Sequence, residues 1–168
     1  MKNKGFSLVE LIIVIAIMAI LAAAIAPALI RYIDKSRRGD DVQAAATINT
    51  AVTATLANEA AYDAAAANMK TGGKVLATAN AHSANSSFVK GSGLSSVDNK
   101  DDVFVNDLNS NLGGEAPQIK YIKDFNNGTT TLFQWEVYAN DAGKPVVKLS
   151  TGNKKLYELQ PSIDPSYK

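Results

Sequence analysis

The sequence predicts an α+β fold in which a long N-terminal α-helix packs on a C-terminal antiparallel β-meander of three to four strands. Three observations lead to this fold class. The run from Leu11 to Ile30 is apolar and contains no charged residue. Apolar residues then recur at three- and four-residue steps as far as Ala67, which indicates an amphipathic helix. From Pro117 onward apolar and polar residues alternate, which indicates strands with one buried face.

Composition limits the classes of function. The 168 residues suffice for one domain with an extension, and the formal net charge is only +1. Basic residues do not form a stripe with interleaved aromatic residues, so nucleic-acid binding is not implied. The chain has no cysteine, which excludes disulfides and thiolate metal sites. A lack of disulfides is compatible with a surface protein of a Gram-positive bacterium.

The apolar run has the length of a membrane span, since about 20 residues cross the hydrocarbon core of a bilayer. A cleavable secretory signal would be shorter and would end in a small-residue cleavage site. This run continues past its alanine-rich part, where Pro27 also disfavours cleavage. A plain anchor explains the length but not the charge of Glu10 at its start. A carboxylate costs about 2.5–3.5 kcal/mol at the centre of a span and less near its ends.

Basic residues flank the run on both sides. Lys2 and Lys4 precede it, whereas four basic residues follow it between Arg31 and Arg38. Counted alone, these charges place the C-terminal flank in the cytoplasm.

The segment from Gly5 to Leu11 reads GFSLVEL. With the short basic leader before it and the apolar run after it, the segment resembles the class III signal of type IV pilins. This signal is the N-terminal motif for prepilin cleavage and methylation. The resemblance covers residues 1–60 and implies that residues 1–5 are a leader peptide, cut between Gly5 and Phe6 by prepilin peptidase. It also implies N-methylation of Phe6, a cytoplasmic leader and an external head, against the charge count.

The resemblance predicts a role for Glu10 as the partner of a positive charge. Cleavage would create an α-amine on Phe6 that is largely cationic at neutral pH. A cation in a lipid-like filament core is disfavoured unless it is paired, and Glu10 can supply the partner. Positions i and i+4 share a helix face, so Glu10 could pair with its own Phe6. The resemblance implies instead an assembly ion pair with Phe6 of the neighbouring subunit. Both pairings stay open at this point.

The chain divides into four segments after the leader. Residues 6–30 are expected to form a transmembrane or filament-core helix, and residues 31–67 an amphipathic helix that continues into the head. Pro27 stands where pilins commonly carry a helix-kinking proline. Ala19 stands where many pilins have glycine. Because of this alanine, the extent to which the helix unwinds between the two positions stays open. The buried stripe of the amphipathic part is expected to consist of Val42, Ala45, Ile48, Val52 and Leu56.

The head is expected to contain a connecting loop region over residues 68–116 with short helical or extended pieces, among them a short helix at Val103–Leu108. A sheet and tail are expected over residues 117–168. The candidate strands are Gln118–Lys123, Thr130–Tyr138, Pro145–Ser150 and a short fourth strand at Lys154–Leu159. Turns are expected at Asn127-Gly128 and at Asp141-Ala142-Gly143. In the middle strand, Phe133, Trp135 and Val137 should face the helix.

No catalytic constellation is present in the sequence, and we expect neither an enzyme nor a cofactor. His82 is the single histidine, so a histidine-based triad or zinc site is not predicted. Asp107, Asn109 and Asn111 form a weak calcium candidate, because oxygen ligands alternate as at the start of a calcium loop. The glycine that should follow stands one place late, and Gln118 replaces the closing glutamate.

The resemblance implies a major structural subunit of a type IV pilus. The chain would polymerise with other pilin subunits through its N-terminal hydrophobic helix into an extracellular filament for adhesion, motility or DNA uptake. Its partners would be prepilin peptidase, the assembly platform and ATPase, and membrane lipid before assembly, when it is a single-pass protein of the cytoplasmic membrane. The alternatives are a pseudopilin of a type II secretion or competence system, a minor pilin, and a membrane-anchored extracellular binding module.

Overall fold

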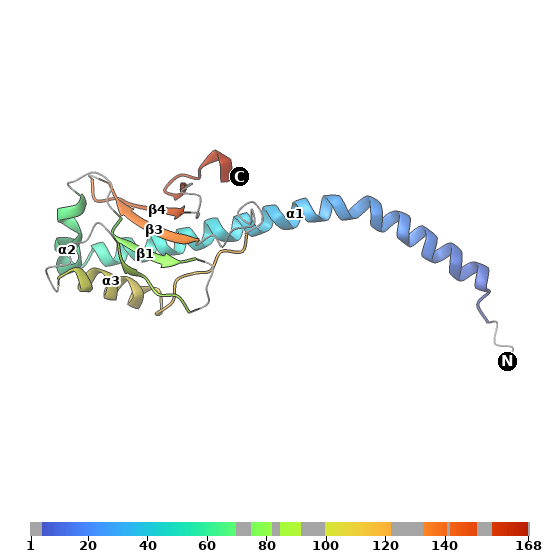
Figure 1. Cartoon of the computed structure of the whole chain (residues 1–168), viewed down its shortest axis with the longest axis horizontal. Helices are drawn as coiled ribbons and strands as arrows, with labels where there is room; N and C mark the ends of the chain where they lie inside the picture. Colours follow the sequence, from blue (N-terminus) through green and yellow to red (C-terminus); the bar gives the residue numbers. More distant parts are fainter. Residues whose placement is uncertain are drawn as a thin grey trace. The chain divides into compact units, whose positions relative to one another are not determined.

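The computed structural model describes residues 5–69, 75–81, 85–91, 100–121, 133–140, 142–150 and 156–167. The chain divides into two units, Met1–Ser36 and Arg37–Lys168. Three α-helices are described: α1 (Leu8–Leu56), α2 (Glu59–Met69) and α3 (Lys100–Asn111). The strands are β1 (Ala77–Asn80), β2 (Val89–Lys90), β3 (Gln134–Ala139), β4 (Pro145–Ser150) and β5 (Leu156–Gln160), and a short 3₁₀ helix, η2, covers Pro165–Tyr167 (Figure 1).

The first unit contains the N-terminal part of α1. Its described residues are all exposed except Asp34, which is half-buried. By length and composition this is the one described helix that could cross a membrane. The predicted apolar helix over residues 6–30 is therefore present from Leu8 onward. It continues through Pro27 without interruption, and the kink expected there stays a prediction.

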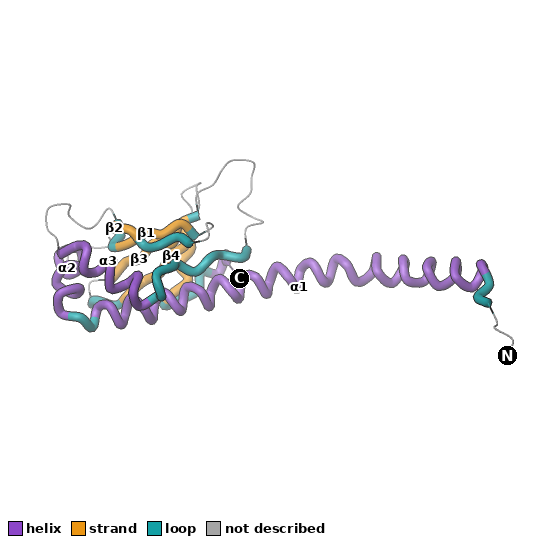
Figure 2. Tube along the Cα trace, turned by 90° about the horizontal axis from the view of Figure 1, so that it is seen from below, coloured by secondary structure: helices purple, strands orange, loops and turns teal. Residues whose placement is uncertain are grey.

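The second unit is built on the C-terminal part of α1. Ala45, Ile48 and Val52 are fully buried, and Val42 and Leu56 pack against the same core, so the predicted stripe is confirmed. Figures 1 and 2 show the strands lying alongside this part of the helix.

The predicted single helix over residues 31–67 is wrong at its C-terminal end. α1 ends at Leu56, and α2 begins at Glu59 after a turn. The reason lies in Asn58, whose Oδ1 accepts a hydrogen bond from the N–H of Ala60 at 3.1 Å. An asparagine in this position caps a new helix rather than continuing the old one.

The sheet has five antiparallel strands in the order β2-β1-β3-β4-β5. Its β3-β4-β5 part is the predicted meander, with Trp135 opposite Leu149 and Leu149 opposite Tyr157. Trp135 and Val137 are fully buried and Phe133 nearly so, which confirms the predicted inward face. The α+β fold class is therefore confirmed.

The region 68–116, which we predicted to be a connecting loop with short helical or extended pieces, contributes regular elements to the head. It contributes β1 and β2 to the sheet, and α3 extends the predicted helix Val103–Leu108 at both ends. The inward residues of β1 are the small Ala77 and Ala79, which is why the sequence shows no strong strand pattern there.

The predicted strand Gln118–Lys123 is wrong over Gln118–Tyr121, which form no strand. The N–H groups of Lys120 and Tyr121 bind the carboxylate of Asp41 instead of a neighbouring strand. The strand β4 has the predicted bounds, and β3 and β5 each end one residue later than predicted. The predicted first residues of these two strands, 130–132 and 154–155, lie outside the described residues. The expected turn at Asn127-Gly128 lies outside the described residues, as does Asp141 of the second turn.

Candidate functional site

The sequence-predicted cleavage position precedes α1. Gly5 and Phe6 lie in a non-helical, exposed stretch, and 88% of Phe6 is accessible to solvent. The first helical residue is Leu8. A peptide bond outside regular structure can enter an extended protease site without unfolding a helix.

Glu10 lies in the first turn of α1 and has a defined partner. The N–H of Ser7 donates a hydrogen bond to Glu10 Oε2 at 2.9 Å. Ser7 is the N-cap of the helix and Glu10 its third residue, which is the spacing of a capping box. A carboxylate is also favoured here by the partial positive charge of the helix N-terminus. The pattern Ser-x-x-Glu was readable in the sequence, but our sequence interpretation treated Glu10 only as an assembly residue.

The geometry brings Glu10 next to the place where cleavage would create a new amine. Phe6 is the residue before Ser7, whose N–H the carboxylate already binds. The first turn of the helix therefore holds the carboxylate near the position that such an amine would occupy.

The apolar side chains of Leu11–Ile30 are all exposed in the described structure. Large residues such as Ile12, Ile20 and Leu29 are each more than half exposed. An apolar surface of this extent requires lipid or other protein chains around it.

Residues 1–26 match a family model described as the prokaryotic N-terminal methylation motif. The chain carries the class III signal of type IV pilins. Such a motif belongs to type IV pilin-like proteins and pseudopilins, which are structural rather than enzymatic. It fits membrane anchoring before assembly and an extracellular filament afterwards, and it gives no support to a Gram-positive source. No solved structure matches the chain.

The weak calcium candidate does not have the form of a loop. Asp107, Asn109 and Asn111 all lie on α3, and successive alternate residues of a helix point in different directions. Asp107 Oδ2 accepts a hydrogen bond from Asn58 at 2.6 Å, and Asn111 donates one to Thr55 Oγ1 at 3.0 Å.

Asn109 has a similar structural role. Its side chain accepts a hydrogen bond from the N–H of Phe88 at 2.7 Å and donates one to the carbonyl of Phe88 at 2.9 Å. The three candidates thus attach α3 to three other segments. No group of three metal-binding residues occurs in the described part of the chain.

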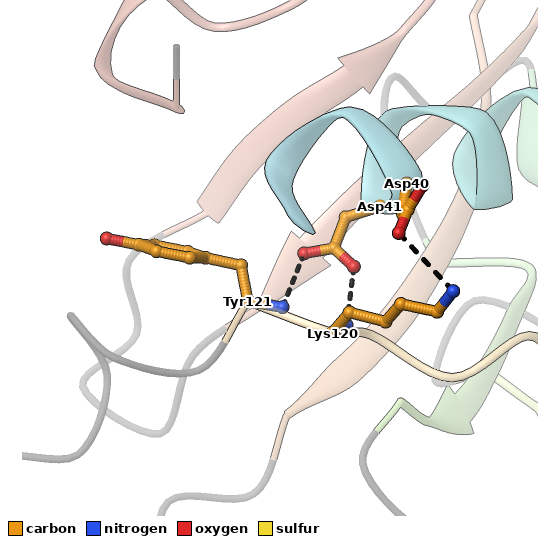
Figure 3. A network of polar contacts seen from close by, with 4 residues as sticks. All are labelled: Asp40, Asp41, Lys120 and Tyr121. Atoms are coloured by element: carbon orange, nitrogen blue, oxygen red, sulfur yellow. Dashed lines mark hydrogen bonds and ion pairs between the residues drawn. The ribbon is translucent and has the colours of Figure 1, made fainter. Parts of the chain in front are cut away.

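A buried polar cluster on α1 escaped the sequence interpretation. Asp41 is completely buried, and its carboxylate accepts three hydrogen bonds. Figure 3 shows the two that come from the backbone of Lys120 and Tyr121. The donors are the N–H of Lys120 at 2.6 Å, the N–H of Tyr121 at 3.1 Å and the hydroxyl of Tyr167 at 2.6 Å. Asp41 stands four residues before Ala45, in phase with the buried stripe, so a charge inside an apolar face was the signal that could have revealed it.

Arg38 completes this cluster one helical turn earlier. Its guanidinium donates to the hydroxyl of Tyr121 at 2.6 Å and to the carbonyl of Tyr167 at 3.3 Å, and it lies 4.2 Å from the centre of the Tyr121 ring. The ring of Tyr167 also packs at 5.4 Å from that of Tyr157. We call Arg38, Asp41, Tyr121 and Tyr167, with the backbone of Lys120, the Asp41 cluster.

Burial dominates the electrostatics of the cluster. It raises the pKa of Asp41 above the ordinary value, while the hydrogen bonds from Tyr167, Lys120 and Tyr121 act in the opposite direction. Burial and the bond to Asp41 raise the pKa of Tyr167, so this hydroxyl stays protonated and remains a donor. The neighbouring ion pair of Asp40 and Lys120, at 3.3 Å, is largely exposed and contributes little.

Proposed function

We propose that the chain is the major structural subunit of a type IV pilus and polymerises through its N-terminal hydrophobic helix. The single observation that supports this best is the combination at the start of α1. A matched methylation motif includes the start of an apolar helix whose described side chains are exposed, and Glu10 is fixed at the N-terminus of this helix. Before assembly, the cytoplasmic membrane provides the cover, and after assembly the helices of other subunits replace the lipid.

The first step in this proposal is cleavage between Gly5 and Phe6 by prepilin peptidase, followed by methylation of Phe6. Cleavage replaces an uncharged peptide group by a cationic amine at the end of an apolar helix. Glu10 neutralises this amine, either in the same subunit or in the next one. An uncompensated charge would be costly in the filament core, so only a subunit that is cut and paired can join.

The later steps follow from the apolar surface. A subunit leaves the bilayer when contacts between helices replace contacts with lipid, in a process driven by the membrane platform and its ATPase. Pro27 removes one backbone hydrogen bond and would give α1 a point at which to bend. The head then forms the filament surface. The remaining alternatives, a pseudopilin or a minor pilin, share the motif and differ in abundance within the fibre.

Mass spectrometry and electron microscopy of surface fibres test the proposal together. We expect the fibres to consist mainly of this chain, with an intact mass equal to residues 6–168 plus one methyl group. Retention of residues 1–5 would contradict the cleavage step. Fibres in which this chain is a trace component would favour a minor pilin, and a chain confined to the cell envelope would favour a pseudopilin.

Substitution of Glu10 tests the ion pair. Glu10→Ala should leave membrane insertion intact but reduce fibre yield at least about tenfold, because a lost charge partner of about 1.4 kcal/mol or more changes the equilibrium by that factor. Glu59→Ala is the matched control, since Glu59 is also an exposed acid in the first turn of a helix. Fibre yield should be normal in the control. Normal yield in Glu10→Ala would overturn the role of Glu10.

A further inference from the structure

The Asp41 cluster lies where the environment of α1 changes. The helix crosses the boundary between the two units at Ser36 and Arg37. Before this boundary, the described side chains are exposed, apart from the half-buried Asp34. Arg38 and Asp41 occupy the next turn, and Asp41 is the first fully buried residue of the chain within the described residues.

The two sides of this turn are stabilised in different ways. Helical turns with exposed side chains depend mainly on their own backbone hydrogen bonds, and outside lipid such turns are only marginally stable. The Arg38–Asp41 turn has additional bonds to residues that are 79 to 129 positions away in sequence. Local opening of the helix cannot pass this turn without breaking them.

The cluster also connects α1 to residues that lie far from it in the sequence. Tyr167 is nearly the last residue, yet it is buried and binds α1 through both its hydroxyl and its carbonyl. Small exported domains often close such long chain segments with disulfides, which reduce the entropy of the unfolded chain. This chain has no cysteine, and in the described residues the C-terminal segment is connected to α1 by the shared hydrophobic core and by the two hydrogen bonds of Tyr167.

We propose that the Asp41 cluster is a stop that confines any unwinding of α1 to its N-terminal side. The part of α1 before Arg37 can then lose helical structure, when it exchanges lipid for protein neighbours or when it is stretched, without opening the head. The stop is a property of the single chain and does not depend on the proposed filament. Its failure would therefore leave the pilus proposal untouched.

Hydrogen exchange of the full chain in detergent micelles, read by mass spectrometry, tests the stop. In the natural chain, amides from Arg38 onward should be better protected than those of residues 31–36, which are mostly exposed and lie beyond the apolar run that the detergent covers. In Asp41→Asn, the amide of the new side chain faces the N–H donors of Lys120 and Tyr121, and one hydrogen bond at least is lost. We expect protection factors between Arg38 and about Ala45 to fall at least about tenfold, while those of β3 and β4 stay within about twofold.

Two further variants make the result decisive. Asp40→Asn is the matched control, because Asp40 is the adjacent acid and forms an exposed ion pair with Lys120 rather than a bond within the cluster. It should exchange like the natural chain. Tyr167→Phe removes one donor to Asp41 without changing shape and should show a smaller loss at the same place. If Asp41→Asn does not fold, Tyr167→Phe alone tests the proposal. Unchanged protection at Arg38–Ala45, or an equal loss throughout residues 37–168, would overturn the proposal.

Discussion

Single residues that are polar and buried determine how this head is put together. Asp41 is the clearest case, since a carboxylate without exposed surface binds two backbone N–H groups and a phenol from distant segments. Such a group stabilises only the arrangement in which all its partners are present, because an unsatisfied buried carboxylate is costly. The half-buried Asn109 also connects distant segments, through two hydrogen bonds to the backbone of Phe88.

The pH dependence of stability reports on Asp41. Burial, the largest effect, raises its pKa, so the folded chain holds the proton more tightly than the unfolded chain. As the pH rises above the ordinary value of 3.8, the unfolded chain releases this proton first, and the free energy of unfolding falls until the folded carboxyl has also titrated. Urea unfolding at several pH values, compared with the non-titrating Asp41→Asn, should show this decline. A difference that grows with pH would mean that the three donors outweigh burial.

Gly91 is a residue at which a single added carbon should matter. A Cβ there would lie 2.2 Å from the carbonyl oxygen of Val75, a backbone atom, and the N–H of Gly91 binds the carbonyl of Leu76 at 2.9 Å. We expect Gly91→Ala to lower the free energy of unfolding by at least about 2 kcal/mol. Gly39→Ala is the control, because nothing lies within 4 Å of its Cβ position. This exposed helical site should gain about 0.5–1 kcal/mol, and equal effects in urea unfolding would contradict the close approach.

At the scale of elements, the end of α1 and the placement of α3 are coupled through one side chain. Asn58 caps α2 with its oxygen and binds Asp107 of α3 with its nitrogen. Thr55 on α1 accepts a hydrogen bond from Asn111 of α3. α3 is therefore attached to the turn at which α1 ends. The strands β1 and β2 extend the sheet beyond β3.

Asn58→Ala tests this coupling. The substitution removes the cap of α2 and the bond to α3, so we expect a loss of about 1–2 kcal/mol in the free energy of unfolding, measured with urea. Asn106→Ala is a suitable control, since Asn106 is an exposed asparagine on α3 itself. The control should change stability by less than about 0.5 kcal/mol. Similar values for the two variants would show that the cap contributes nothing.

At the scale of the whole molecule, the chain combines two units with different requirements. The first exposes apolar side chains and needs lipid or protein around it. The second has a single core that combines the C-terminal part of α1 with α2, α3 and the sheet.

A shortened chain of residues 34–168 should fold without the first unit. It retains the whole second unit, including the Asp41 cluster, because this unit begins at Arg37. We expect a soluble protein with a circular dichroism spectrum of mixed helix and strand and a cooperative thermal transition. A spectrum of disordered chain would show that the head depends on the apolar helix.

The sequence by itself determined the features that depend on local order. The motif from Gly5 to Glu10, the apolar helix, the buried stripe from Val42 to Leu56 and the β3-β4-β5 meander follow from spacing and periodicity, which are properties of neighbouring residues. The tertiary structure alone decided the partners of Asp41, the entry of the alanine-rich β1 into the sheet and the loss of the predicted strand at Gln118–Tyr121. The physical reason is that these outcomes depend on hydrogen bonds between residues far apart in the chain. The N–H groups of Lys120 and Tyr121 could bind a strand or a carboxylate, and only the folded chain brings Asp41 within reach.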